Sequence, residues 1–228
     1  MTYQHLWSQP NVAGQAAASL PLGKIICVGQ NYADHIKEMG SNVGTEPMLF
    51  IKTAGCARDM AKPFSVPTRW GCCHFETEMS VLIGARLQDA SPAQGLASVV
   101  GIGLAFDLTL RELQAALKQK GHPWEKAKGF DGSAPLSAFV APPEDLQNVG
   151  LRLTRNGVVT QDGNTRDMLT PVGELLAYAS QFFTLEPGDV LLTGTPAGVG
   201  PLESGDELVA QLLDGNGASL LHIATQVI

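Results

Sequence analysis

Short apolar runs separated by glycine- and proline-containing turns dominate the chain, and they predict a protein built mostly of β-strands. The predicted strands cover residues 24–29, 48–52, 75–84, 101–109, 151–160, 189–194 and 206–227. The Asn-Gly pair at 156–157 lies between two alternating runs, a pattern typical of a tight hairpin turn. The turn residues 214–217 predict a second hairpin inside the last run.

Four segments show helical patterns instead: residues 31–39, 91–99, 109–120 and 171–182. The first is predicted to have Asn31 as its N-cap. In the third, leucines recur at helical spacing until Gly121 ends the pattern. The fourth opens with Pro171, whose missing N–H costs little at a helix start. Strands outnumber helices in an irregular order, so we expect an α+β, mostly β fold rather than a βαβ repeat.

Composition and charge narrow the class of protein. The chain has 228 residues, 44% of them hydrophobic and 16% charged, which is typical of a globular protein. The net charge is −7 and no cluster of Lys and Arg occurs, which argues against a nucleic-acid partner. No apolar run has the roughly 20 residues of a membrane span. We expect one domain over residues 23–228, preceded by an N-terminal extension over 1–22.

Neither the start of the chain nor its cysteines suggest secretion. The first residues lack a basic segment followed by an apolar one, so we expect a cytoplasmic protein. The four cysteines, Cys27, Cys56, Cys72 and Cys73, form no C-x-x-C pair. We interpret them as reduced thiols.

An acidic triplet carries the clearest chemical signal. Glu76 and Glu78 lie two residues apart in a predicted strand, so both carboxylates point to one face. Asp107 ends another strongly apolar strand and could supply a third oxygen ligand. Three carboxylates without a thiolate suit a hard cation such as Mg²⁺ or Mn²⁺. The alternative is a pair of ordinary surface glutamates on an exposed strand.

A second group of candidate residues lies on the predicted helices. His35 and Glu38 are three residues apart on one helix face, where the carboxylate could orient the imidazole as a general base. The alternative is a surface pair. The Gly- and Asn-containing stretch 39–47 could be a lid or only a loop. Arg111 and Gln114 follow Asp107 at the start of a helix and could face the same cavity or solvent.

Seven segments, in the same order along the chain, resemble the fumarylacetoacetate hydrolase family: residues 28–39, 46–52, 74–84, 106–114, 123–131, 156–168 and 185–206. Within the family the chain is similar to the small acylpyruvate hydrolases and the oxaloacetate decarboxylases or tautomerases. The resemblance implies a mixed β-roll, a homodimer and a Mg²⁺ or Mn²⁺ cofactor. Phe75, where many relatives have histidine, and Gln30, where relatives vary, bear on substrate fit.

The resemblance also implies roles for individual residues. The metal ligands would be Glu76, Glu78 and Asp107. His35 and Glu38 would form the dyad that activates water, and Lys128 would be the catalytic cation. Arg111, Gln114 and Thr195 would contact the substrate. We therefore expect a metal-dependent hydrolase that cleaves a C–C bond in acylpyruvates such as acetylpyruvate or fumarylpyruvate, through a pyruvate enolate. Its partner would be a small 2-oxo acid.

Three alternatives stay open on the same residues. The first is oxaloacetate decarboxylation or keto–enol tautomerisation, in which His35 would move the proton. The second is isomerisation or decarboxylation of a longer dioate from aromatic catabolism. The third is a non-catalytic metal- or ligand-binding protein on the same fold.

Overall fold

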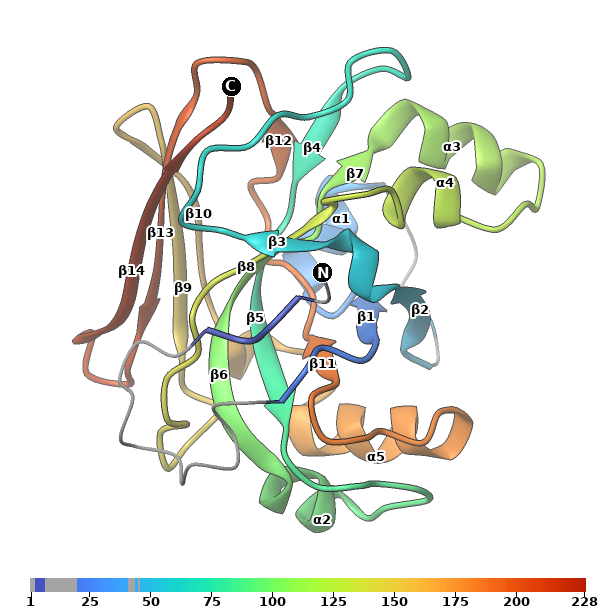
Figure 1. The fold of residues 1–228 in the computed structure, drawn as a ribbon, viewed down its shortest axis with the longest axis vertical. Coiled ribbons are helices and arrows are strands. Elements are labelled where there is room, and N and C mark those ends of the chain that lie inside the picture. Colours follow the sequence, from blue (N-terminus) through green and yellow to red (C-terminus); the bar gives the residue numbers. More distant parts are fainter. Residues whose placement is uncertain (1–2, 7–19, 41–43, 45) are drawn as a thin grey trace.

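The computed structural model describes residues 3–6, 20–40, 44 and 46–228 (Figure 1). Most of the predicted N-terminal extension, and residues 41–43 and 45 of the predicted lid or loop, lie outside the described residues. Residues 3–6 pack on the domain, where His5 Nε2 lies 2.8 Å from the carbonyl oxygen of Gly188 and Phe139 donates its backbone N–H to Leu6. No described helix is long and apolar enough to span a membrane.

The largest sheet has seven strands in the order β2-β1-β11-β5-β6-β8-β3. Their bounds are β1 Ile25–Gly29, β2 Met48–Lys52, β3 Ala57–Asp59, β5 Thr77–Ile83, β6 Val99–Phe106, β8 Ala134–Leu136 and β11 Val190–Leu192. Successive residues of β1 alternate between two apolar clusters, with Ile25 in one and Ile26 in the other. Both faces of the sheet are therefore buried at its inner strands, which explains why β1 and β11 are almost continuously apolar.

Pairing inside this sheet brings distant segments to one place. Antiparallel β5 and β6 set Thr77 opposite Phe106, so the residues just before β5 and just after β6 are neighbours. The backbone N–H of Asp107 donates to the carbonyl oxygen of Glu76 at 2.8 Å. β1 pairs in parallel with β11, so the segments that follow these two strands leave the same edge of the sheet.

Two smaller sheets complete the β structure. One has the order β10-β9-β13-β14 and stands on one side of the molecule, and the other has the order β12-β4-β7 (Figure 1). Their strands are β4 Cys73–Phe75, β7 Thr109–Leu110, β9 Gly150–Arg155, β10 Val158–Asn164, β12 Gly200–Pro201, β13 Glu207–Leu213 and β14 Ser219–Gln226. Both predicted hairpins are confirmed, with Asn156 and Gly157 at positive φ in the first turn.

In the described part of the chain the helices are α1 Ala33–Glu38, α2 Pro92–Ala97, α3 Arg111–Gln119, α4 Glu125–Lys128 and α5 Val172–Phe182, with 3-10 turns at Ala54–Cys56 and Thr165–Asp167. The predicted N-cap of α1 is wrong. Tyr32 occupies that position, and the Asn31 amide instead donates to the carbonyls of Thr193 and Thr170 at 2.9 and 3.1 Å. Asn31 therefore ties the start of α1 to the segment after β11.

The mostly β, α+β fold of the prediction is confirmed, and the differences lie in short elements. The strands β3, β8 and β12 have two or three residues each, and Pro135 and Pro201 interrupt the sequence pattern of two of them. α4 has only four residues. Such elements are fixed by their neighbours in space rather than by a periodic pattern of their own.

Candidate active site

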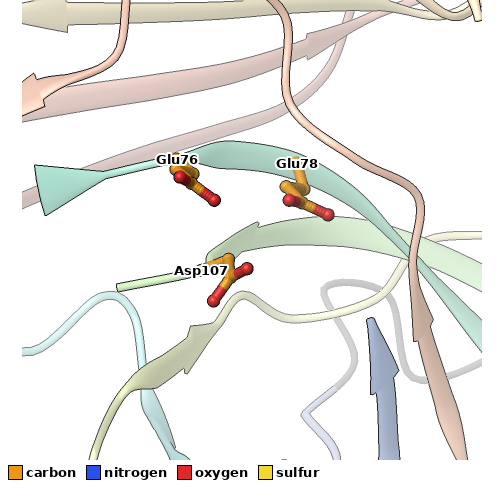
Figure 2. A group of neighbouring side chains, drawn as sticks. All are labelled: Glu76, Glu78 and Asp107. Atoms are coloured by element: carbon orange, nitrogen blue, oxygen red, sulfur yellow. The ribbon is translucent and has the colours of Figure 1, made fainter. Parts of the chain in front are cut away.

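Three carboxylates converge at the end of the large sheet where β5 begins and β6 ends (Figure 2). Glu76 lies between β4 and β5, Glu78 is in β5, and Asp107 directly follows β6. One oxygen from each lies within 4.8 Å of the others, and the three residues are 6%, 1% and 2% exposed. The alternative of exposed surface glutamates is therefore wrong.

Burial and mutual repulsion set opposite electrostatic states for the two glutamates. Burial, Asp107 and Glu76 together hold the pKa of Glu78 well above its ordinary value. Burial also acts to raise the pKa of Glu76, but the charges of Lys128 and Arg111 outweigh it and hold that pKa well below its ordinary value. A divalent cation would relieve the repulsion on Glu78, and oxygen-only ligands fit Mg²⁺ or Mn²⁺. The donor set therefore fits the predicted metal.

Two basic residues contact the acidic cluster from the helices above it. Lys128, at the end of α4 and 3% exposed, donates to Glu76 Oε2 at 2.7 Å and to Asp107 Oδ2 at 2.6 Å. Arg111, at the start of α3, donates to Glu76 and, at 2.9 Å, to Gln114 Oε1. The resemblance implied that Arg111 and Gln114 contact the substrate and that Lys128 is the catalytic cation. In the structure Lys128 and Arg111 contact the acids themselves.

No sequence pattern marked Lys52, at the end of β2, yet it contacts the acidic cluster through Asp107. It is fully buried, and its ammonium lies 2.8 Å from Asp107 Oδ1. It also donates to the backbone carbonyls of Leu108, Lys128 and Ser133. A lysine that ends an apolar strand was the only signal in the sequence, and a buried lysine needs such partners.

The predicted dyad is assembled on α1. His35 Nδ1 lies 3.1 Å from Glu38 Oε2, and His35 is only 6% exposed. The two carboxylate oxygens of Glu38 also accept from the backbone N–H of Gly198, at 3.1 and 3.2 Å. Because Nδ1 faces Glu38, Nε2 is the nitrogen left to exchange a proton. The alternative of an exposed pair is wrong for the histidine.

The segment after β11 closes the site from the other side. Gly194 donates its backbone N–H to Glu78 Oε2 at 2.7 Å. Thr195 is buried, donates to the carbonyl of Thr77 at 2.9 Å and accepts from Gln161 Nε2 at 2.8 Å. These contacts hold Thr195 in one orientation, so its position is fixed before any ligand arrives.

A cavity of about 210 Å³ joins these groups. Every predicted site residue except Glu38 lines this active-site cavity, and Glu38 lies behind His35. The lining residues are Val28, Gly29, Gln30, His35, Met39, Met48, Phe50, Glu76, Glu78, Asp107, Arg111, Gln114, Ala115, Lys118, Trp124, Lys128 and Thr195. The volume suits a small organic acid rather than a polymer.

The family described as fumarylacetoacetate (FAA) hydrolase C-terminal matches residues 24–227, and the chain belongs to it. Among its relatives, oxaloacetate tautomerase YcgM of Escherichia coli is 51% identical over 196 residues, which cover 85% of this chain and 90% of that one. Human mitochondrial oxaloacetate tautomerase FAHD1 is 40% identical over 203 residues, covering 85% and 92%.

Solved structures show the same fold. A fumarylpyruvate hydrolase of Pseudomonas aeruginosa, in complex with Mn²⁺ and pyruvate, superposes with a TM-score of 0.89 at 28% identity and covers 100% of this chain and 96% of its own. A family protein from Yersinia pestis reaches a TM-score of 0.89 at 47% identity, with 99% and 100% covered. The family is one of enzymes, and its members include oxaloacetate tautomerases and a fumarylpyruvate hydrolase.

Proposed function

We propose that the protein is a metal-dependent oxaloacetate keto–enol tautomerase. The observation that carries the proposal is the His35–Glu38 dyad, which places one buried imidazole on the wall of the cavity that holds the carboxylate triad. Two relatives with high identity and nearly full coverage bear that activity in their names. The hydrolysis expected first from the sequence becomes the second candidate.

The triad is the proposed metal site. Glu76, Glu78 and Asp107 would hold Mg²⁺ or Mn²⁺, which supplies electrostatic stabilisation of the negative charge that develops on the 2-oxo oxygen of the substrate. The three carboxylates alone would repel an anionic acid. With a divalent ion in place, the charges of Arg111, Lys128 and Lys52 leave the site positive overall and able to attract one.

His35 is the proposed proton carrier. In the keto-to-enol direction its Nε2 removes a proton from C3 of oxaloacetate, while the 2-oxygen gains a proton from water. The imidazolium then returns its proton to the hydroxide that this water leaves, so the enzyme ends in its starting state. In the reverse direction His35 returns the proton to C3. The Nδ1–H donates to Glu38, which stabilises the imidazolium that forms, and Gly198 fixes Glu38 in turn. The dyad therefore sets both the tautomer and the orientation of the ring.

A rate measurement with matched histidine variants tests this role. The substrate is enol-oxaloacetate with Mg²⁺, and its conversion to the keto form is followed by absorbance. We expect His35→Ala to lower kcat by about 10²–10⁴, and exposed His122→Ala to leave it unchanged. Wild-type kcat in His35→Ala would remove the dyad from the mechanism.

Acylpyruvate hydrolysis is the second candidate, because a His–Glu dyad beside a metal site can also activate water. The fumarylpyruvate hydrolase of Pseudomonas aeruginosa has the same fold. A panel of acetylpyruvate, fumarylpyruvate and oxaloacetate, with separate assays for cleavage, CO₂ release and ketonisation, separates the candidates. If His35→Ala lost cleavage but kept CO₂ release, the dyad would serve water and both activities would be real.

A further inference from the structure

One face of α3 runs along the active-site cavity. The cavity is lined by Arg111, Gln114, Ala115 and Lys118, which follow the spacing of a single helix face. Arg111 lies at the inner end, where it contacts Glu76. Lys118 lies two turns further along the helix, and its residue is exposed. The face therefore connects the acidic cluster to the outer part of the cavity.

The basic residues of the cavity differ in whether an acid already compensates them. Arg111 pairs with Glu76, and Lys128 pairs with Glu76 and Asp107. Among the residues that the structure describes, no carboxylate lies within ion-pair distance of Lys118. Its ammonium instead lies 5.3 Å from the centre of the Trp124 ring. Lys118 is thus the cavity-lining cation whose charge stays available to a ligand.

We propose that Lys118 is a specificity-determining residue that binds the second carboxylate of the substrate, so that the site selects dicarboxylic 2-oxo acids over acids with a neutral tail. The inference rests on the proposed tautomerase function and adds the substrate class. An α-oxo acid needs one end at the triad, where the metal site and the dyad lie. Its other end then extends toward the outer cavity.

The contact of Lys118 with Trp124 holds the ammonium beside the cavity. Lys118 and Trp124 both line it, together with Gln114 one turn earlier on α3. The ring of Trp124, which also lines the cavity, restricts the lysine through a cation–π contact. Such a contact lowers the entropy lost when the ammonium pairs with a carboxylate.

Away from the acidic cluster and its paired cations Arg111 and Lys128, the other described walls offer no cation for a second carboxylate. Met39, Met48 and Phe50 present apolar surface to the cavity, and Gln30 presents a neutral amide. A carboxylate placed against these residues without a cation would lose hydration and gain little. The charge of Lys118 therefore distinguishes a dianion from a monoanion of similar size.

The test compares two substrates that differ only in the second carboxylate: oxaloacetate and its 4-ethyl ester. Ketonisation is measured with Mg²⁺ for the wild type, Lys118→Met and Lys118→Arg. We expect Lys118→Met to raise KM for oxaloacetate about tenfold, to change kcat less than twofold, and to leave KM for the ester unchanged. Lys118→Arg should restore most of the affinity, because it keeps the charge.

Lys120→Met is the matched control, since it removes the same charge from the same end of α3 but lies outside the cavity lining. It should leave both KM values at those of the wild type. Two results would overturn the proposal: an equal rise of KM for both substrates in Lys118→Met, or no rise for either.

Equilibrium binding separates this proposal from the proposed function. Quenching of tryptophan fluorescence in the Mg²⁺-loaded enzyme gives dissociation constants for oxaloacetate and for pyruvate, which lacks the second carboxylate. A wild-type preference for oxaloacetate that falls about tenfold in Lys118→Met supports the role of Lys118, even if the wild type fails to catalyse ketonisation. Equal wild-type affinities, or a preference that survives in the variant, would contradict it.

Discussion

Glu78 shows how one residue can conflict with its surroundings and thereby indicate a ligand. Its carboxyl is 1% exposed and shares its space with two other acids. Among the described residues, its hydrogen bond comes from the backbone N–H of Gly194, whereas Glu76 and Asp107 each receive ammonium or guanidinium groups. Of the three acids it therefore gains most from a cation.

Replacing Glu78 by Gln separates folding from metal binding. The raised pKa means that the ionised carboxylate is disfavoured in the folded protein. We therefore expect the melting temperature of metal-free Glu78→Gln to be at least that of the wild type, and a gain of about 1 kcal/mol in the free energy of unfolding would raise it by a few degrees. Added Mg²⁺ should raise the melting temperature of the wild type but not of the variant. Calorimetric scans with and without Mg²⁺ check this. An equal Mg²⁺ shift in both proteins would remove Glu78 from the metal site.

Lys52 gives a second prediction at the residue scale. Lys52→Met removes the ammonium from one Asp107 oxygen and from three buried carbonyls, of which those of Lys128 and Ser133 each keep a second donor. We expect a loss of about 3 kcal/mol in the free energy of unfolding, mainly because Asp107 stays buried with one cation fewer. Lys24 is the matched control, because it pairs with Asp189 but is 27% exposed and distant from the site. Lys24→Met should cost about 1 kcal/mol. Urea unfolding measures both, and equal losses would contradict the distinction.

At the scale of elements, the segment between β11 and β12 connects the dyad to the triad. Gly194 contacts Glu78, and Gly198 contacts Glu38. Asn31 holds the same segment to the start of α1. The side chains of the site are therefore positioned by a loop whose backbone N–H groups point at two different acids.

Gly198 tests this arrangement. Its φ is +97°, and a Cβ there would lie 1.9 Å from the carbonyl oxygen of Thr160, so Gly198→Ala must move the loop. Gly205 has a φ of +98° with nothing within 4 Å of a Cβ, so it carries the same backbone strain without the contact. We expect Gly205→Ala to cost about 1 kcal/mol with kcat unchanged. Gly198→Ala should cost about 2 kcal/mol more and lower kcat.

Chemical unfolding and ketonisation rates of the two alanine variants provide the comparison. Equal stabilities with equal kcat would show that the loop does not position Glu38. A loss of kcat in Gly198→Ala alone is the result that the contacts predict.

The sequence predicted the long elements and the local pairs, because these depend on neighbours a few residues away. The hairpin at 156–157 and the His35–Glu38 pair are of this kind. The short strands, the capping of α1 and the burial of Lys52 depend on residues more than 50 positions away, such as Asp107 or Thr193. No periodic pattern in one segment can encode such a partner. For the site, the resemblance to a known family identified which residues lie together, and the structure gave the contacts between them.

At the scale of the whole molecule, Asp206 joins the four-stranded sheet to the turn before β13. It accepts from Arg155, Asn156 and the backbone N–H of Glu203, each at 2.8 Å. Burial acts to raise its pKa, but these hydrogen bonds and the Arg155 charge outweigh burial and hold the pKa below its ordinary value of 3.8. Folding therefore favours the ionised form of Asp206.

The lowered pKa of Asp206 predicts that its ionised carboxylate adds to the free energy of unfolding in a pH-dependent way. The stabilisation is fully present at pH values above 3.8 and is lost as the pH falls through the lower pKa of the folded protein. Asp206→Asn should cost about 1 kcal/mol at pH 7, and the difference from the wild type should vanish in strong acid. Urea unfolding as a function of pH measures this, and a difference that is constant with pH would contradict it.

The most direct test of the central claim is the rate of enol-oxaloacetate ketonisation by chelator-treated enzyme as Mg²⁺ is added back. We expect no turnover above the uncatalysed rate without metal, and saturating activation by Mg²⁺ in the wild type that is absent in Glu78→Gln. Full turnover by the metal-free wild type, or identical Mg²⁺ activation in the variant, would contradict it.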